Sequence, residues 1–150
     1  MSTIDELRGA AERRILVLDG ASGSELQTLG LTEDDLRGDR FRHHPQSLAG
    51  DLDLLALTRP DVVRDLHLGY LEAGADIITT STFSSTAVAQ REYGLDEPVL
   101  IDELNRAAAG IARAAADDVA RRDGRQRWVA GAIGPTNVTL SLSPRVEDPG

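Results

Sequence analysis

Short apolar runs alternate along this chain with longer segments that have helical periodicity. Residues 15–18 form a continuous apolar run that Asp19 and Gly20 end, and a run of this kind is typical of a strand buried on both faces. Residues 75–80, with Ile77 and Ile78 at the centre, and residues 128–133 have the same character. The pattern therefore predicts three strands.

Helices are expected between these strands, because start and stop signals flank the periodic segments. Pro60 and Asp61 begin a helix that Gly74 ends, and Pro98 begins a longer one that reaches about Arg122 and stops at Gly124. The first of these has an apolar face at near-helical spacing, made of Val62, Val63, Leu66, Tyr70 and Ala73.

Weaker signals predict four further features. Ser22 and Glu25 have the spacing of a capping box, with Gly30 as the helix end, and Ser84 or Ser85 can cap a helix running to Tyr93 before Gly94. Residues 1–14 are interpreted as a short leading helix or a frayed tail, and residues 31–53 as irregular. The order strand, helix, strand, helix, strand indicates parallel strands joined by right-handed crossovers. This pattern leaves both a closed (β/α)8 barrel and an open doubly wound sheet possible.

Composition narrows the function classes. The net charge is −9, all 16 basic residues are arginines, and no basic face is expected, so nucleic acid is a poor partner. Cysteine is absent, which excludes disulfides and any cysteine-based zinc or redox site within these residues. No apolar run approaches the roughly 20 residues of a membrane span, and the charged N-terminus is unlike a signal peptide. We therefore expect a cytoplasmic protein without a membrane partner.

All three predicted strands end in small or hydroxyl-bearing residues. The loops are 19–24, 79–82 and 134–137, and ligands in α/β folds bind at the carboxyl ends of strands. The simpler interpretation is that strand ends are rich in turn formers. In the first loop, Gly20 and Gly23 permit close backbone approach, the helix-start amides could hold a carboxylate, and Asp19 could pair with an ammonium group. A structural strand-to-helix turn is the alternative.

Other titratable residues give weaker hypotheses. His43 and His44 are adjacent, so they point in different directions, and a solvated loop is favoured over a metal pair. A packed or partly exposed side chain is favoured over a metal ligand for His67. Asp51 and Asp53 could form a carboxylate pair, although ordinary loop solvation is favoured.

Three segments together resemble the homocysteine S-methyltransferase family. They are ILVLDGASGSELQ from Ile15, RPDVVRDLHLGYLEAGADIITTSTFSST from Arg59, and VAGAIGPTNVTLSLSPRVEDP from Val129, the last being similar to methionine synthases of the cobalamin type. The resemblance implies a (β/α)8 TIM-type barrel of which this chain is the N-terminal portion, about three β/α units. Residues 1–14 would be an extension and residues 15–150 the partial homocysteine-binding domain.

The resemblance also implies a function, which is methyl transfer to the thiol of homocysteine to make methionine. In the family, zinc held by three cysteines deprotonates the thiol, and cobalamin on a separate module is the donor in the methionine synthase type. The residues that match the family's ligand-facing loops are Asp19, Gly20, Ser22, Gly23, Ser24, Thr80, Thr82, Gly134, Thr136 and Asn137. No catalytic or metal-binding residue is expected in this chain.

Departures from the family pattern leave alternatives open. Ala21, Thr79 and Ser81 replace residues usual at ligand-facing positions, and the family's zinc cysteines lie in later strands. Three strands cannot close a barrel that usually needs about 250 residues, so this chain alone is expected to be inactive and to require the remaining barrel half or other methionine synthase modules. The alternatives are a non-catalytic amino-acid-binding or regulatory remnant and a fragment of a betaine- or S-methylmethionine-dependent homocysteine methyltransferase.

Overall fold

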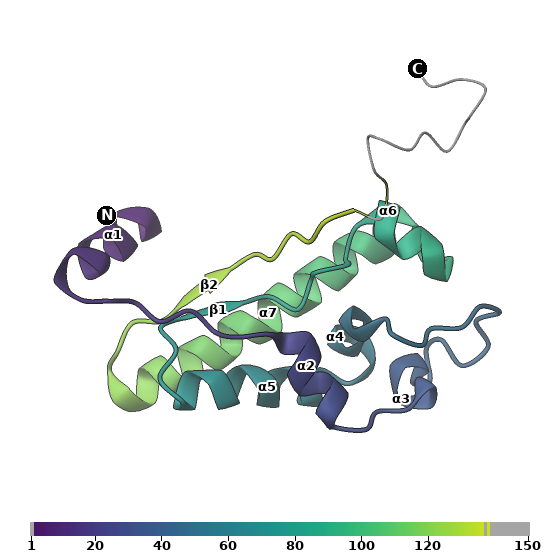
Figure 1. Ribbon diagram of the computed structural model, residues 1–150, viewed down its shortest axis with the longest axis horizontal. Helices are drawn as coiled ribbons and strands as arrows, with labels where there is room; N and C mark the ends of the chain where they lie inside the picture. Colours follow the sequence, from purple (N-terminus) through teal and green to yellow (C-terminus); the bar gives the residue numbers. More distant parts are fainter. Residues whose placement is uncertain (1, 137, 139–150) are drawn as a thin grey trace, which may run out of the picture.

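The computed structural model describes residues 2–136 and residue 138, and its order of elements is mixed α/β (Figure 1). The two strands β1 (Ile77–Thr79) and β2 (Trp128–Ala130) are parallel, with Ile77 opposite Trp128. Leu18 adds a parallel bridge to Ile77 on the other side of β1. The predicted parallel arrangement is confirmed, although both strands are shorter than the predicted runs.

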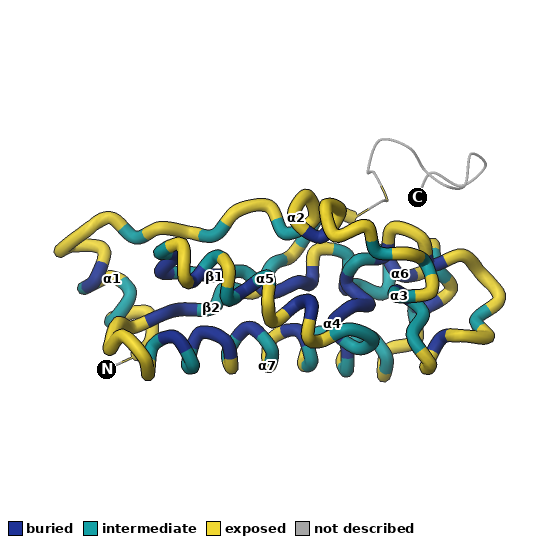
Figure 2. Tube along the Cα trace, turned by 90° about the horizontal axis from the view of Figure 1, so that it is seen from below, coloured by how far each residue is buried: buried dark blue, intermediate teal, exposed yellow. Residues whose placement is uncertain are grey.

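Two helices cover one face of this small sheet. Helix α5 (Pro60–Glu72) precedes β1 and helix α7 (Pro98–Asp123) precedes β2, and each lies alongside the strands (Figure 1). Pro begins both helices, and Gly74 and Gly124 follow them with positive φ, as predicted. Buried positions recur along both helices in Figure 2. The core between them and β1 consists of Leu71, Ala75, Ile78, Ala112, Ala115, Ala116 and Val119.

Short elements form the rest of the described chain. The leading segment is a helix, α1 (Thr3–Arg13), and α2 (Ser22–Thr28) follows the first apolar run. The segment expected to be irregular contains α3 (Glu33–Arg37) and the 3-10 helix η1 (Leu52–Leu54), followed directly by α4 (Leu55–Thr58). The predicted third helix is divided into α6 (Ala87–Gln90) and the 3-10 helix η2 (Arg91–Tyr93). A second core joins α2, α3, α4 and α5 through Leu26, Leu36, Leu55, Val62 and Val63.

Two predicted helix caps are wrong. The N-cap of α2 is Ala21, which has no side-chain acceptor, and Ser22 already lies inside the helix, so the capping box with Glu25 does not form. Thr86, not Ser84 or Ser85, caps α6 by accepting a hydrogen bond from the Ala89 N–H at 3.2 Å. A capping box does form at Thr32 with Asp35, and it starts α3 where an irregular segment was expected.

The expectation that residues 15–18 form a strand buried on both faces is also wrong. Ile15 is 88% exposed, and Val17 and Leu18 are 51% and 55% exposed. The backbone pairs with β1, since the N–H groups of Asp76 and Ile77 donate to the Val17 carbonyl and the Asp19 N–H donates to the Ile77 carbonyl. The segment is therefore an edge, and within the described residues nothing covers its outer face.

A buried carboxylate connects the amino-terminal ends of the three parallel segments. Asp76 is 1% exposed and accepts two hydrogen bonds from the Arg14 guanidinium, at 2.6 and 2.7 Å. It also accepts from Arg125 at 2.9 Å and from the Val17 N–H at 3.0 Å. The hydrogen bonds from Arg14, followed by the Val17 N–H and the charges of both arginines, lower the pKa of Asp76 to about 2. Asp76 thus links residues that are 49 to 62 positions away in the sequence.

Among the helices in the part of the chain that the structure describes, none combines the length and the apolar character needed to cross a bilayer.

Candidate functional site

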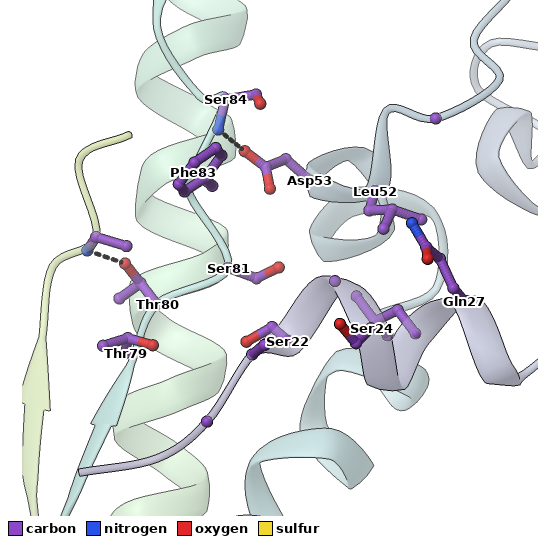
Figure 3. Close-up of a pocket in the computed structure, with 16 residues that line it drawn as sticks. Ser22, Ser24, Gln27, Leu52, Asp53, Thr79, Thr80, Ser81, Phe83 and Ser84 are labelled. Atoms are coloured by element: carbon purple, nitrogen blue, oxygen red, sulfur yellow. Dashed lines mark hydrogen bonds between the residues drawn. The ribbon is translucent and has the colours of Figure 1, made fainter. Parts of the chain in front are cut away.

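A cavity of about 520 Å³ lies at the carboxyl end of the strands, between the loop after β1, helix α2 and the η1 segment (Figure 3). Its position is the one predicted for a ligand in an α/β fold. Its walls are rich in hydroxyl groups and in exposed backbone. The lining residues are Gly20, Ala21, Ser22, Gly23, Ser24, Leu26, Gln27, Gly50, Leu52, Asp53, Thr79, Thr80, Ser81, Phe83, Ser84 and Ala132.

The segment that follows residue 18 and begins α2 lines this cavity with its glycines and serines. Gly20, Ser22, Gly23 and Ser24 all line it, and their predicted contact with a substrate stays a prediction. A Cβ atom at Gly20 would lie 3.1 Å from the Tyr70 hydroxyl oxygen, and that hydroxyl donates to the Ala21 carbonyl at 3.3 Å. The absence of a side chain at Gly20 therefore lets Tyr70 of α5 support the loop from behind.

Asp19 does not line the cavity, because its carboxylate is bound to the strand beside it. Oδ2 accepts a hydrogen bond from the Thr79 N–H at 2.8 Å, and the Thr79 hydroxyl donates to Oδ1 at 3.1 Å. Burial raises the pKa of Asp19, and the hydrogen bonds from Thr79 oppose that effect. The predicted role of Asp19 in binding an ammonium group stays a prediction, and in this structure its geometry is that of a link between two strand ends.

Thr80 and Thr82 hold the end of β2 in place. The Ala132 N–H donates to Oγ1 of Thr80 at 3.0 Å, and the Thr82 hydroxyl donates to the Ala132 carbonyl at 2.8 Å. The two threonine oxygens are 2.7 Å apart, so the Thr80 hydroxyl donates to Thr82. This hydrogen-bond chain continues the strand pairing after the ladder has ended. Thr80 lines the cavity and Thr82 is buried behind it.

The third predicted loop contributes less to the cavity. Gly134 packs against Phe83, with so little space that a Cβ atom would clash with the Phe83 carbonyl oxygen. Thr136 is exposed and donates to the Val138 carbonyl at 3.0 Å. Neither residue lines the cavity, and Asn137 lies outside the described residues.

Asp53 is the carboxylate of the cavity wall. It is 6% exposed, and its Oδ2 accepts hydrogen bonds from the Ser84 N–H at 2.6 Å and from the Ser85 hydroxyl at 2.8 Å. Burial raises the pKa of Asp53, and the hydrogen bonds from Ser85 and from the backbone N–H groups of Ser84 and Phe83 oppose the rise. The expectation that Asp53 is an ordinary solvated loop residue is therefore wrong.

Asp51 is buried as well, at 2% exposure, behind the cavity wall. Its Oδ1 accepts from the Gln90 amide nitrogen at 3.0 Å. Burial raises the pKa of Asp51 to about 7, the Gln90 hydrogen bond opposes the rise, and the charge of Asp53 adds to it. Asp51 and Asp53 alternate with Leu52 and Leu54 in the sequence, and this pattern is the sequence signal that could have indicated their burial. The pattern could not show which segments cover the two carboxylates.

The histidines lie apart from the cavity. His43 is exposed, and Nε2 of His44 lies 2.7 Å from the Tyr93 carbonyl oxygen. His67 is fully buried on α5, and burial lowers its pKa to about 4. No group of three histidine, aspartate or glutamate side chains that could hold a metal ion occurs among residues 2–136 and 138.

Known proteins share both the sequence pattern and the fold. The sequence profile of the family described as Homocysteine S-methyltransferase matches residues 16–149. Two solved structures of the homocysteine methyltransferase MmuM from Escherichia coli, one of the oxidized form and one of the metallated form, match 86% of this chain at 26% identity, both with a TM-score of 0.67. The chain spans 40% and 41% of their lengths.

Proposed function

We propose that this chain, which belongs to the homocysteine S-methyltransferase family, supplies part of the wall of a homocysteine-binding site. The observation that carries the proposal is the position of the cavity. It lies at the carboxyl ends of parallel strands, where the glycine- and serine-rich loop 20–24 meets the hydroxyl-bearing loop 79–84.

The proposed architecture is the N-terminal portion of a (β/α)8 barrel, with residues 15–150 as the partial domain and residues 1–14 as an extension. The parallel order of the 15–18 segment, β1 and β2, with helices between each segment and the next, supports it. In this arrangement the exposed faces of Ile15, Val17 and Leu18 would contact the rest of the barrel. The methyl-transfer activity is therefore proposed for the assembled barrel, by which we mean this chain together with the remaining strands and helices of a complete (β/α)8 barrel.

Thiol activation needs groups other than the described residues. Zinc lowers the pKa of a bound thiol, and its usual protein ligands are cysteine, histidine and carboxylates. The 150 residues contain no cysteine, and the described ones contain no cluster of three suitable side chains. These residues do not fit a zinc site, so their proposed task is to bind and orient the substrate, and this chain alone is expected not to transfer methyl groups.

The methionine synthase type is the finer proposal, with methylcobalamin as the donor. The similarity of segment 129–149 to that type supports it. Methyl-transfer assays on the assembled barrel, with methylcobalamin, betaine and S-methylmethionine as alternative donors, test this choice. Transfer from methylcobalamin alone is expected, whereas transfer from betaine or S-methylmethionine would overturn the assignment. Binding of homocysteine without any transfer would instead indicate an amino-acid-binding protein.

Calorimetric titration of the chain with L-homocysteine tests the proposed binding site. Ser22 lines the cavity, and its hydroxyl makes no hydrogen bond to another described residue, so Ser22→Ala should weaken binding about 2- to 10-fold through one lost hydrogen bond. Thr3→Ala is the control, because Thr3 is exposed on α1 outside the cavity and its replacement should leave the affinity unchanged. Absence of heat together with no change in thermal stability would rule the proposal out.

A further inference from the structure

A second cavity, which we call the outer groove, lies between helices α2 and α5 and has a volume of about 640 Å³. It shares no lining residue with the cavity at the strand ends. A ligand of the first cavity therefore does not account for the outer groove, whose floor, border and neighbouring strand edge each indicate what could cover it.

The floor of the outer groove is a second apolar stripe on α5. One stripe of this helix is buried inside the described chain and consists of Val63, His67 and Leu71. The other recurs at intervals of four, three and four residues and consists of Val62, Leu66, Gly69 and Ala73, all of which line the groove. A helix with apolar residues on two sides needs cover on both, and this spacing is the one by which helices pack on each other.

The second stripe is open toward the end of α5. Gly69 and Ala73 are exposed, and Leu29, which follows α2 and lines the same groove, is 56% exposed. A Cβ atom at Gly69 would have no other atom within 4 Å, so the side chains of a partner have room above this position. The described residues cover the stripe at Val62, which is 9% exposed, and leave the rest of it accessible.

The border of the outer groove is acidic. Glu25, Asp61 and Asp65 line it, with Arg59 as its one basic residue. Arg59 donates hydrogen bonds to Asp61 at 2.8 Å and to Asp35 at 3.3 Å, so its charge is compensated. Glu25 and Asp65 make no side-chain hydrogen bond or ion pair with another described residue. The border therefore favours a partner with basic residues and disfavours a second copy of this chain, whose net charge is −9.

The outer groove lies on the side of the sheet where the edge of segment 15–18 is open. The Val17 carbonyl and the Asp19 N–H are bonded to β1, whereas Leu16 and Leu18 make no backbone hydrogen bond within the described chain. Helix α5 packs against β1 and α2, and α7 packs against both β1 and β2 (Figure 1). A strand added at the open edge and joined to a helix would place that helix beside α5, over the groove.

We infer that the outer groove is the docking surface for an amphipathic helix that carries basic residues beside its apolar face. This inference rests on the proposed function, because the rest of the assembled barrel is the partner that would pair with the 15–18 edge and bring such a helix. It predicts that the groove selects a helix by charge as well as by apolar contact.

The test measures the binding of two synthetic helical peptides to the full chain by fluorescence anisotropy. Each has about 18 residues with leucine and alanine along one face, and the positions beside that face carry arginine in one peptide and glutamate in the other. Asp65→Arg reverses one border charge, and Glu12→Arg, at an exposed position of α1, makes the same change in net charge away from the groove. Gly69→Gln places a polar side chain on the floor. Gly110→Gln is its control, because Gly110 is an exposed glycine of α7 with equally open space around a Cβ.

The wild-type chain should bind the arginine peptide about tenfold more tightly than the glutamate peptide. Asp65→Arg should reduce that preference about threefold, and Gly69→Gln should weaken binding of the arginine peptide about five- to tenfold, because its amide would be covered without a partner. Both control variants should behave as the wild type does. Equal affinities for the two peptides, no binding of the arginine peptide, or equal effects of a variant and its control would overturn the inference.

Sedimentation of the chain without peptide tests the competing occupant. The wild type is expected to be free of any association through the groove, and a dimer that Gly69→Gln dissociates would show that a second copy fills it, which would overturn the inference. Homocysteine calorimetry remains a separate measurement. Failure of the peptides to bind would leave the proposed homocysteine site intact, whereas absence of homocysteine binding would remove the proposed function whatever the peptides do. Circular dichroism and thermal unfolding of each variant check that the fold is retained.

Discussion

The amide nitrogen of Gln90 donates to Oδ1 of Asp51 at 3.0 Å, and the remaining side-chain oxygens of both residues are buried without a partner among the described residues. Two acceptors without a donor are costly in a protein interior. A proton on Asp51 supplies a donor and removes a buried charge. The raised pKa of about 7 agrees with this arrangement.

Asp51→Asn should therefore flatten the stability profile between about pH 4 and pH 7. Because the folded-state pKa of Asp51 lies above its ordinary value of 3.8, the folded state binds the proton more tightly. Stability from this group is present at low pH and is lost as pH rises toward 7, with a slope of at most about 1.4 kcal/mol per pH unit. Urea unfolding at several pH values measures the slope. The exposed Asp65, replaced by Asn, is the control, and an unchanged slope in Asp51→Asn would contradict the prediction.

His67 should make the stability depend on pH in the opposite direction. Its folded-state pKa of about 4 lies below the ordinary 6.5, so the unfolded chain binds the proton more tightly and stability falls as pH drops from 6.5 toward 4. Both ring nitrogens are buried without partners, so His67→Leu should remove this acid sensitivity and raise stability at pH 5. Thermal unfolding at pH 5 and pH 8 measures the effect, with the exposed His43→Leu as control. If His67→Leu lost the same stability at pH 5 and at pH 8, packing of the side chain and not its protonation would determine the effect.

Asp76→Asn should destabilise the chain by about 2–3 kcal/mol. The carboxylate is 1% exposed and pairs with Arg14 and Arg125, which are about half exposed, so the loss is smaller than for a fully buried pair. Asp102→Asn breaks an exposed pair with Arg106 and should cost less than about 1 kcal/mol. The denaturant midpoints of the two variants measure these two costs. Similar costs for both substitutions would mean that Asp76 does not organise the strand ends.

Gly134→Ala should disturb the loop that carries Phe83. A Cβ at this position meets the Phe83 carbonyl oxygen, so either segment must move, at a cost of about 1–3 kcal/mol. Nothing lies within 4 Å of a Cβ at Gly131, and Gly131→Ala should stay within about 0.5 kcal/mol of wild type. Equilibrium unfolding gives the cost, and homocysteine titration shows whether the cavity is altered. A neutral Gly134→Ala would indicate that the two loops are free to separate.

Local signals in the sequence were sufficient for the main helices and for the family. Proline fixes φ and glycine tolerates positive φ wherever they occur, so the limits of α5 (Pro60, Gly74) and α7 (Pro98, Gly124) could be predicted without knowing their neighbours. The glycine- and serine-rich loop after residue 18 was likewise recognisable, and it lines the cavity.

Burial and hydrogen-bond partners depended on segments that are distant in sequence. Asp53 becomes a cavity carboxylate because the loop at 84–85 closes over it from about 30 residues away, and Asp19 faces Thr79, 60 residues away. The apolar run 15–18 looked like an interior strand, yet Val17 and Leu18, which point to opposite faces, are both more than half exposed, because the described residues leave both faces partly uncovered. An apolar or charged residue specifies a preference for an environment, whereas the environment exists only after the chain has brought its parts together.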